Sequence, residues 1–345
     1  MIPYIIFILV VIFAYRLKKP IWMAVIITFF SVIRFDTGWD YDSYYQVCID
    51  NNALETAKII WGGIWAKWFE YVNLHRIPFI GIGIPAVLTT IIVYYALYLL
   101  HEKDKKQIAD SLLVYSLWPF LYLYSFCTVR QSLAISIVLL IVVLVSKKRF
   151  VLGGLLFVLN YFLHPSSIFT IVFLPFILVK KRLSVGMILG GTVLVGAFFG
   201  FASFLLESLG LSNYLGLLES TDSFGGKIAI VYAALSIYLI YVVVHNKDVT
   251  SLYSKMTSIV AMGAILQFLV YITDVPSVIS RACSYTYIFM APTLFYTFRQ
   301  IRFKEGKNLA IVIMALFFLV YLYVTQDSPD AASQYVPYKT IFSQL

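Results

Sequence analysis

The feature that most constrains this chain is a series of apolar stretches separated by short clusters of basic residues. A membrane-spanning helix needs about 20 apolar residues, and shorter stretches serve when neighbours and interfacial aromatic residues complete them. Mean hydropathy is +0.88 and only 12% of the 345 residues are charged, which excludes an ordinary water-soluble fold. We therefore predict an all-α polytopic membrane protein with about 12 transmembrane helices, within a range of roughly 11 to 13. The candidate spans are residues 2–16, 20–33, 78–100, 111–126, 128–146, 151–163, 165–179, 184–206, 227–245, 257–273, 278–298 and 309–325.

The basic residues predict the orientation of these spans. Of the 26 Lys and Arg residues, 18 fall in every second connection between spans. The positive-inside rule places those connections in the cytoplasm and both termini outside. By the same topology, 12 of the 17 Asp and Glu residues lie outside, which favours an external working face. Topology also accounts for the net charge of +9, so we expect no nucleic-acid partner.

We expect one membrane domain over 1–345, with external segments at 34–77, 207–226 and 326–345. The N-terminal apolar run is expected to be a retained helix, because its basic residues follow it. Three cysteines match no metal or redox spacing, so we expect no metal and no cofactor. In the first external segment, helical spacing predicts an amphipathic helix in the membrane interface, although it could simply anchor the loop. Its residues are Trp61, Ile64, Trp65, Trp68 and Phe69.

The first candidate site follows the second predicted span. Acidic, basic and aromatic side chains gather there and could bind sugar hydroxyls and sugar C–H faces. A purely structural loop held by salt bridges is the alternative. The residues are Arg34, Asp36, Asp40, Tyr41, Asp42, Tyr44 and Tyr45.

The second candidate site is the start of the span at 128–146. Thr128 and Gln131 have the spacing of a capping box, which places Arg130 in the first helical turn. Free backbone N–H groups and the positive helix end already favour anions there, so an added arginine indicates a phosphate site. The alternative is an arginine that only extends its charge to the membrane surface.

Two further sites lie on the predicted outer side. His164 precedes Pro165, which suits the first position of a helix. The imidazole could act as an acid, as a base or as a hydrogen-bond donor to phosphate, or it could merely be a polar anchor. Arg281 is followed one turn later by Tyr285 and could close on a diphosphate together with Arg130. Pairing of Arg281 with Asp274 is the structural alternative.

Four motifs together resemble a known family. They are R-F-D-T-G-W-D-Y-D-S-Y-Y, T-V-R-Q-S-L-A-I-S-I, F-L-H-P-S-S and a late R-x-x-x-Y, and they run from Arg34 to Tyr285. This pattern resembles the EpsG-like family, which overlaps the Wzy-type polymerases of O-antigen and capsular polysaccharide. The glycine-aspartate-tyrosine loop and the Arg130-Gln131 helix start are its most specific parts.

The resemblance implies a metal-independent glycosyltransferase of GT-C-like architecture in the bacterial cytoplasmic membrane, with its active site facing outside. Undecaprenyl-diphosphate-linked oligosaccharides would be donor and acceptor, and membrane lipid and a chain-length regulator protein are the other partners considered. We expect Arg130 and Arg281 to stabilise the leaving diphosphate, with Asp40 as first candidate base and His164 as second. The candidate substrate-binding residues are Arg34, Asp36, Tyr41, Tyr44, Gln131 and Tyr285.

Two other classes of function remain open at this stage. A flippase for lipid-linked oligosaccharides would bind diphosphate without chemistry, and would place cations through a central cavity at both leaflets. A membrane ligase or acyltransferase would transfer a finished chain or an acyl group. Neither an inverted repeat nor a pair of broken helices is visible in the sequence, which favours the polymerase.

Overall fold

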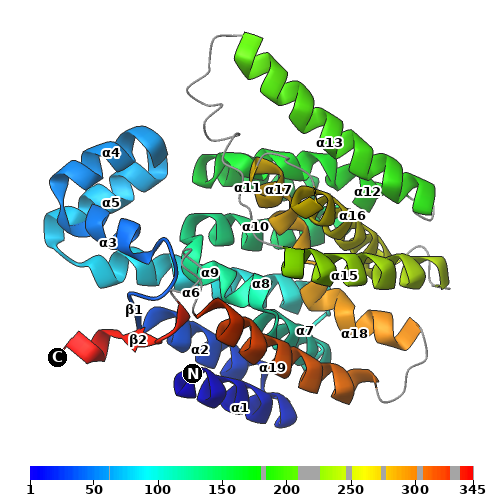
Figure 1. The fold of residues 1–345 in the computed structure, drawn as a ribbon, viewed down its shortest axis with the longest axis horizontal. Helices are drawn as coiled ribbons and strands as arrows, with labels where there is room; N and C mark the ends of the chain where they lie inside the picture. The colour runs from blue at the N-terminus through cyan, green and yellow to red at the C-terminus, as the bar shows by residue number, and fades with distance from the viewer. Residues whose placement is uncertain are drawn as a thin grey trace. The chain divides into compact units, whose positions relative to one another are not determined.

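The structure, a computed structural model, describes residues 1–61, 63–179, 184–208, 226–245, 251–272, 277–300, 306–326 and 335–344, and these are almost entirely helical (Figure 1). They fall into two compact units, and each is described by itself. Unit 1 comprises Met1–Pro165 and Glu305–Leu345, and unit 2 comprises Ser166–Lys304. The single membrane domain expected from the sequence stays a prediction.

The helices of unit 1 are α1 (Ile2–Arg16), α2 (Pro20–Val32), α3 (Tyr41–Ile49), α4 (Asn51–Trp61), α5 (Gly63–His75), α6 (Pro78–Leu100), α7 (Lys105–Leu117), α8 (Pro119–Tyr122), α9 (Tyr124–Cys127), α10 (Val129–Ser146), α11 (Phe150–Leu163) and α19 (Gly306–Thr325). Two short strands, β1 (Arg34–Phe35) and β2 (Lys339–Thr340), pair antiparallel, and a 3₁₀ turn (Ile341–Gln344) follows β2.

Unit 2 begins in a 3₁₀ helix over Pro165–Val172, whose first residue closes unit 1. Its α-helices are α12 (Leu174–Leu178), α13 (Val185–Ser208), α15 (Gly226–His245), α16 (Leu252–Ile272), α17 (Ser277–Tyr287) and α18 (Met290–Gln300). The apolar helix α16 forms the core of this unit, where it contacts α12, α13, α15, α17 and α18.

Four of the described helices are long and apolar enough to cross a membrane: α6, α10, α16 and α19. Shorter apolar helices accompany them, including α1, α2 and α11. Together these helices define a multi-pass α-helical membrane protein, as the sequence predicts, while the number of spans stays a prediction.

Two predicted spans are interrupted in the structure, and proline explains the first interruption. The span predicted at 111–126 is instead α7 followed by the short helices α8 and α9, because Pro119 cannot continue the helix before it. Trp118, the residue before Pro119, is accordingly extended, with ψ of 109°. The span predicted at 165–179 begins in 3₁₀ geometry and becomes α-helical only at α12.

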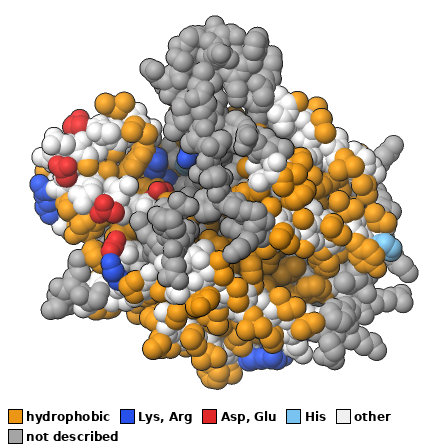
Figure 2. Space-filling view, in the orientation of Figure 1, with side chains coloured by type: hydrophobic (Ala, Val, Ile, Leu, Met, Phe, Trp, Pro, Cys, Tyr) orange, Lys and Arg blue, Asp and Glu red, His pale blue; other side chains and the backbone are white. Residues whose placement is uncertain are grey.

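The core of unit 1 is α10, which is buried along almost its whole length and contacts α6 and α11. Helices α1, α11 and α19 of the same unit carry many exposed large apolar side chains, among them Phe13 (65% exposed) and Val151 (80%). Figure 2 shows hydrophobic side chains covering much of the face over α1 and α19. Such a surface suits contact with lipid, where apolar side chains need no cover from water.

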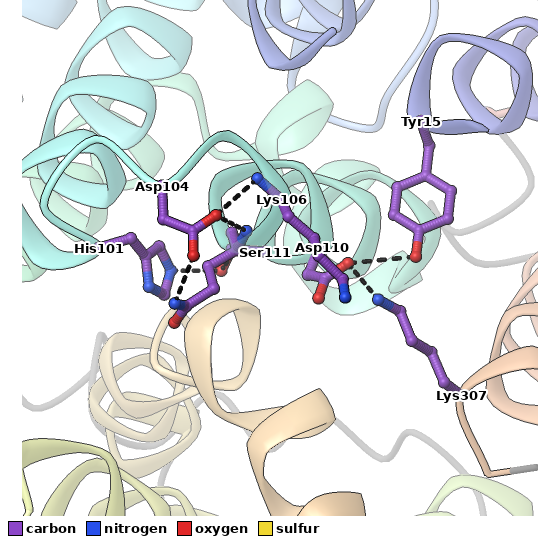
Figure 3. Close-up of polar contacts among 8 residues, drawn as sticks. Tyr15, His101, Asp104, Lys106, Asp110, Ser111 and Lys307 are labelled. Atoms are coloured by element: carbon purple, nitrogen blue, oxygen red, sulfur yellow. Dashed lines mark hydrogen bonds and ion pairs between the residues drawn. The ribbon is translucent and has the colours of Figure 1, made fainter. Parts of the chain in front are cut away.

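A polar cluster joins three helices at one end of unit 1. A carboxylate oxygen of Asp110, in α7, accepts hydrogen bonds from the Tyr15 hydroxyl of α1 and from the Lys307 ammonium of α19 (Figure 3). Asp104 caps α7 by accepting from the backbone N–H groups of residues 106 and 107. All these residues lie at predicted cytoplasmic ends of their helices, so the structure brings those ends together within unit 1.

The predicted amphipathic interfacial helix needs correction. The chain forms two helices, α4 and α5, because it turns at Gly63, which has a positive φ of 25°. Trp65 and Phe69 are buried, and the Trp65 indole N–H donates to the Leu163 carbonyl 2.6 Å away. The most aromatic face of this hairpin therefore packs against protein. The large apolar side chains on its exposed face are Ile59, Ile60, Ile64, Tyr71 and Leu74.

Candidate active site

The loop from β1 to α3 makes a tight turn against the end of α9. Gly38 has φ of +103°, a conformation that disfavours any residue with a Cβ atom. A Cβ at this position would also lie 2.6 Å from the carbonyl oxygen of Phe126. Glycine is thus required here for both conformation and space. The turn therefore holds the loop against Phe126 and Cys127, which lie a few positions before Arg130 in the chain.

Arg34 lies beneath this loop and is only 1% exposed. Its guanidinium carbon sits 4.8 Å from the centroid of the Phe126 ring, and Nη1 donates to the Ser31 carbonyl. Nε and Nη2 have no hydrogen-bond partner among the described residues. Burial lowers the pKa of Arg34, while the nearby Tyr41 and Tyr338 hydroxyls oppose that effect. Burying a cation with unpaired N–H donors costs free energy, so the groups packed around Arg34 must offset that cost.

Helix α3 presents the acidic and tyrosine side chains of the loop. Asp40 is the N-cap residue and is partly exposed, although its side chain does not cap the helix. Tyr41 and Tyr44 are 3% and 4% exposed. Burial raises the pKa of Tyr41 to about 12, so its hydroxyl stays protonated at neutral pH and can donate a hydrogen bond but cannot serve as a base. Asp36 is exposed and pairs with Lys339.

Arg130 stands in the first turn of α10, as predicted, and is held by aromatic residues. Its guanidinium carbon lies 4.2 Å from the centroid of the Trp61 ring, and Nε donates to the Tyr44 hydroxyl at 3.5 Å. No carboxylate pairs with Arg130 among the described residues. A π face holds a guanidinium without neutralising it, so both terminal nitrogens can still bind an anion.

The predicted capping box at α10 is wrong. The Thr128 side chain makes no capping hydrogen bond. Its hydroxyl instead donates to the Tyr124 carbonyl of α9 and shares a hydrogen bond with Ser132, a local alternative to capping that is common for threonine. Gln131 is 4% exposed and accepts from the Tyr124 hydroxyl at 3.2 Å. The free N–H groups of the first turn are thus not occupied by Thr128.

His164 follows the last residue of α11 and is partly exposed. Its backbone N–H donates to the Asn160 carbonyl, and the chain then enters the 3₁₀ helix with Pro165 at its first position, as predicted. Asn160 is fully buried and binds the Ala134 carbonyl of α10, which fixes the end of α11 against the core. His164 therefore belongs to unit 1.

The remaining predicted residues belong to unit 2. Arg281 is exposed on α17, whereas Tyr285, one turn later, is fully buried. The Tyr285 hydroxyl lies 3.0 Å from the Ser166 hydroxyl, which directly follows the His164-Pro165 pair in the chain. Asp274, the alternative partner of Arg281, lies outside the described residues. The joint action of Arg130 and Arg281 stays a prediction, since they belong to different units.

Sequence reasoning missed two contributions to this site. Trp61 was assigned to a membrane-facing stripe, yet its ring supports Arg130, and only the fold could bring together residues so far apart in the chain. The external tail was expected to be long enough for a site, but none of its residues was chosen. Tyr335 nevertheless makes a T-shaped contact with Trp39 of the loop, and the Lys339 N–H donates to the Thr37 hydroxyl. Among the described residues, no three His, Cys, Asp or Glu side chains cluster in a way that could hold a metal ion.

The fold and this site define a class: a multi-pass helical membrane protein in which aromatic side chains of α3 and α4 contact a cationic helix start. The model of the EpsG family matches residues 19–340, nearly the whole chain, and the protein belongs to that family. Membership indicates a polysaccharide-polymerase type of role in polysaccharide biosynthesis. No curated protein and no solved structure matches the chain.

Proposed function

We propose that this protein is a polysaccharide polymerase that joins undecaprenyl-diphosphate-linked oligosaccharides, with its active site on the outer face of the bacterial cytoplasmic membrane. The observation that carries the proposal is the state of Arg130. Its guanidinium rests on Trp61 and Tyr44 without a carboxylate partner among the described residues, and so is ready for an anionic group. A GT-C-like architecture, with this lipid-linked donor and acceptor, is part of the same proposal.

In the reaction, a hydroxyl of the incoming repeat unit attacks C1 of the sugar that links the growing chain to its lipid. A new glycosidic C–O bond forms and the bond from C1 to the diphosphate oxygen breaks, with its electron pair remaining on the diphosphate. Negative charge therefore grows on the leaving group in the transition state. A guanidinium fixed in advance stabilises that charge more than the charge of the ground state, which lowers the barrier.

The proton of the attacking hydroxyl needs an acceptor. Asp40 is our first candidate, because it is partly exposed at the N-cap of α3, one turn before Tyr44, which contacts Arg130. His164 is the second candidate. Tyr41 is excluded as a base at neutral pH by its raised pKa. Asp36, Tyr41, Tyr44, Gln131 and Tyr285 remain proposed substrate-binding residues, and Arg281 remains the proposed second diphosphate ligand. Arg34 was also expected to bind substrate, but it is only 1% exposed, so we do not propose it again in that role.

The test uses the purified full-length protein in lipid nanodiscs with a defined undecaprenyl-diphosphate-linked oligosaccharide. We expect a ladder of products that differ by one repeat unit. Arg130→Ala and Arg281→Ala should each lower kcat about 100- to 1000-fold, the loss typical of removing one group that stabilises developing charge. Arg76→Ala is the matched control, because Arg76 is an exposed arginine between α5 and α6 that touches none of the candidate residues. Normal ladders from both site variants would refute the role of Arg130 and Arg281 at the leaving diphosphate.

Trp61 provides a finer test of the Arg130 support. Trp61→Ala should lower kcat roughly 2- to 30-fold, the factor equivalent to the 0.5–2 kcal/mol of a cation–π contact. Trp61→Phe, which keeps an aromatic face, should retain most of the activity. Products distinguish the other classes of protein: one addition indicates a ligase, and movement of the oligosaccharide across the bilayer without a new bond indicates a flippase.

A further inference from the structure

The C-terminal segment Tyr335–Gln344 pairs with the chain where the loop that carries Asp40 begins. Strand β2 pairs with β1, with Arg34 opposite Thr340 and Phe35 opposite Lys339. The Ile341 N–H donates to the Ile33 carbonyl at 2.9 Å, and the Lys339 N–H donates to the Thr37 hydroxyl at 3.3 Å. Residues 33–37, which lead into the loop and begin it, are therefore hydrogen-bonded to residues 339–341.

Two buried tyrosines fix this segment to the helices beneath it. The Tyr338 ring stacks on Phe30 with centroids 4.1 Å apart, and its hydroxyl donates to the Phe30 carbonyl. The Tyr335 hydroxyl lies 2.9 Å from Cys127 Sγ, and the Tyr335 carbonyl accepts from Tyr4 at 2.6 Å. The segment is thus attached to α1, α2 and α9 as well as to the loop.

The opposite side of the loop is in contact with α9. Gly38 packs against the Phe126 and Cys127 backbone so closely that a Cβ atom would not fit. Arg34 is enclosed between this contact and the C-terminal segment, with Phe126 on one side and Tyr338 among the groups that face it. The loop is therefore clamped between two parts of the protein, and the C-terminal segment is the part that the candidate mechanism has not used.

We propose that residues 335–344 are a positioning element of the active site, which closes over Arg34 and holds the loop with Asp40, Tyr41 and Tyr44 in its working conformation. This inference rests on the proposed polymerase function for its effect on rate, but its structural part can be tested separately. Arg34 acts in this arrangement as the buried centre of the clamp, a positioning residue. Lys339 contributes less, because its ion pair with Asp36 is half-exposed and such pairs contribute little to stability.

The experiment compares the full chain with a chain ended after Gln334, and with the variants Tyr338→Ala and Phe342→Ala. Phe342 is the matched control, since it is an aromatic residue of the same segment that is 60% exposed. Two quantities are measured: hydrogen exchange of the amides of residues 36–45, and the kcat and KM of ladder formation. Exchange in α10 serves as the check that unit 1 remains folded.

We expect the shortened chain and Tyr338→Ala to exchange faster in residues 36–45, with α10 unchanged. Their kcat should fall up to about 100-fold, as when a catalytic group is misplaced by about 1 Å. Phe342→Ala should behave like the full chain. A synthetic peptide of residues 335–345 added to the shortened chain should restore both slow exchange and kcat, which loss of general stability would not allow.

Unchanged exchange in residues 36–45, or a normal kcat in the shortened chain, would overturn the proposal. A rise in KM alone, with slow exchange retained, would also overturn it, because it would mean that the segment contacts substrate and does not hold the loop. If the shortened chain fails to insert, Tyr338→Ala decides. A full chain that makes no ladder would contradict the polymerase function, while the exchange result would still decide whether the segment holds the loop.

Discussion

Gly38 is the residue whose identity the structure constrains most sharply. Its φ of +103° disfavours any side chain, and a Cβ atom there would lie only 2.6 Å from the Phe126 carbonyl oxygen. Gly154, in α11, is the converse case, since a Cβ there meets nothing within 4 Å. One glycine is therefore needed by the loop, and the other is an ordinary helix position.

We predict that Gly38→Ala destabilises the loop by roughly 1–3 kcal/mol or more, the scale of backbone strain at such a conformation. Hydrogen exchange of residues 36–45 should become faster and ladder formation should fall. Gly154→Ala, the control, should leave both unchanged or slightly stabilise α11, because alanine is the better helix former. Equal behaviour of the two variants would show that the loop does not depend on this turn.

At the residue scale, unusual charges could be predicted from the sequence but their partners could not. Arg130 was predicted because it breaks the positive-inside pattern at the start of an apolar run. Its contact with Trp61 depends on how α4 folds back toward α10, which no local pattern encodes. The capping box was wrong for a similar reason, since the Thr128 hydroxyl contacts Tyr124 and Ser132 where α9 meets α10.

At the scale of elements, long apolar helices were predicted well and interruptions poorly. Helices α1 and α6 begin and end where their hydrophobicity predicts, because lipid-facing helices need uniform apolar composition. The stretch at 111–126 is equally apolar, yet Pro119 divides it. The hairpin α4–α5 shows the limit of periodicity: the spacing was helical, but the chain turns at Gly63 and a different face is exposed.

The exposed face of α5 leads to a prediction about the membrane interface. Leu74 is 77% exposed and lies close to the start of the apolar helix α6, while Glu55 on α4 is exposed among charged residues. An environment-sensitive fluorophore on Leu74→Cys should show a blue-shifted emission and quenching by brominated lipid, because this end of α5 lies at the interface. The same label on Glu55→Cys should show neither effect. Equal quenching at both positions would contradict this placement.

At the scale of the molecule, the contacts in unit 1 join helix ends of the same predicted side of the membrane. Tyr15, Asp110 and Lys307 meet at one end, and all lie on the predicted cytoplasmic side (Figure 3). Tyr4 meets Tyr335, and Arg34 meets Thr340, and all of these lie on the predicted outer side. The residues that touch at each end are therefore ones that the alternation of charges assigns to the same side of the membrane. The charges could not reveal the contacts themselves.

This agreement supports a prediction about topology. A reporter fused after Arg149, between α10 and α11, should report the cytoplasm, because the basic cluster there favours the inner side. A reporter fused near Asp222, which lies outside the described residues, should report the outside. A pair of reporters active on the two sides of the membrane, such as alkaline phosphatase and a fluorescent protein, measures this. Reversed signals would place the candidate site in the cytoplasm.

The pairing of β1 with β2 has a consequence for how the protein is made. The loop is synthesised early, but the strand and tyrosines that fasten it come from residues about 300 positions later in the chain. During translation the loop therefore lacks these contacts until residues 335–344 have been synthesised. Under the proposed function, the loop would reach its working conformation only after residues 335–344 are made, so a chain released before them would not elongate glycan.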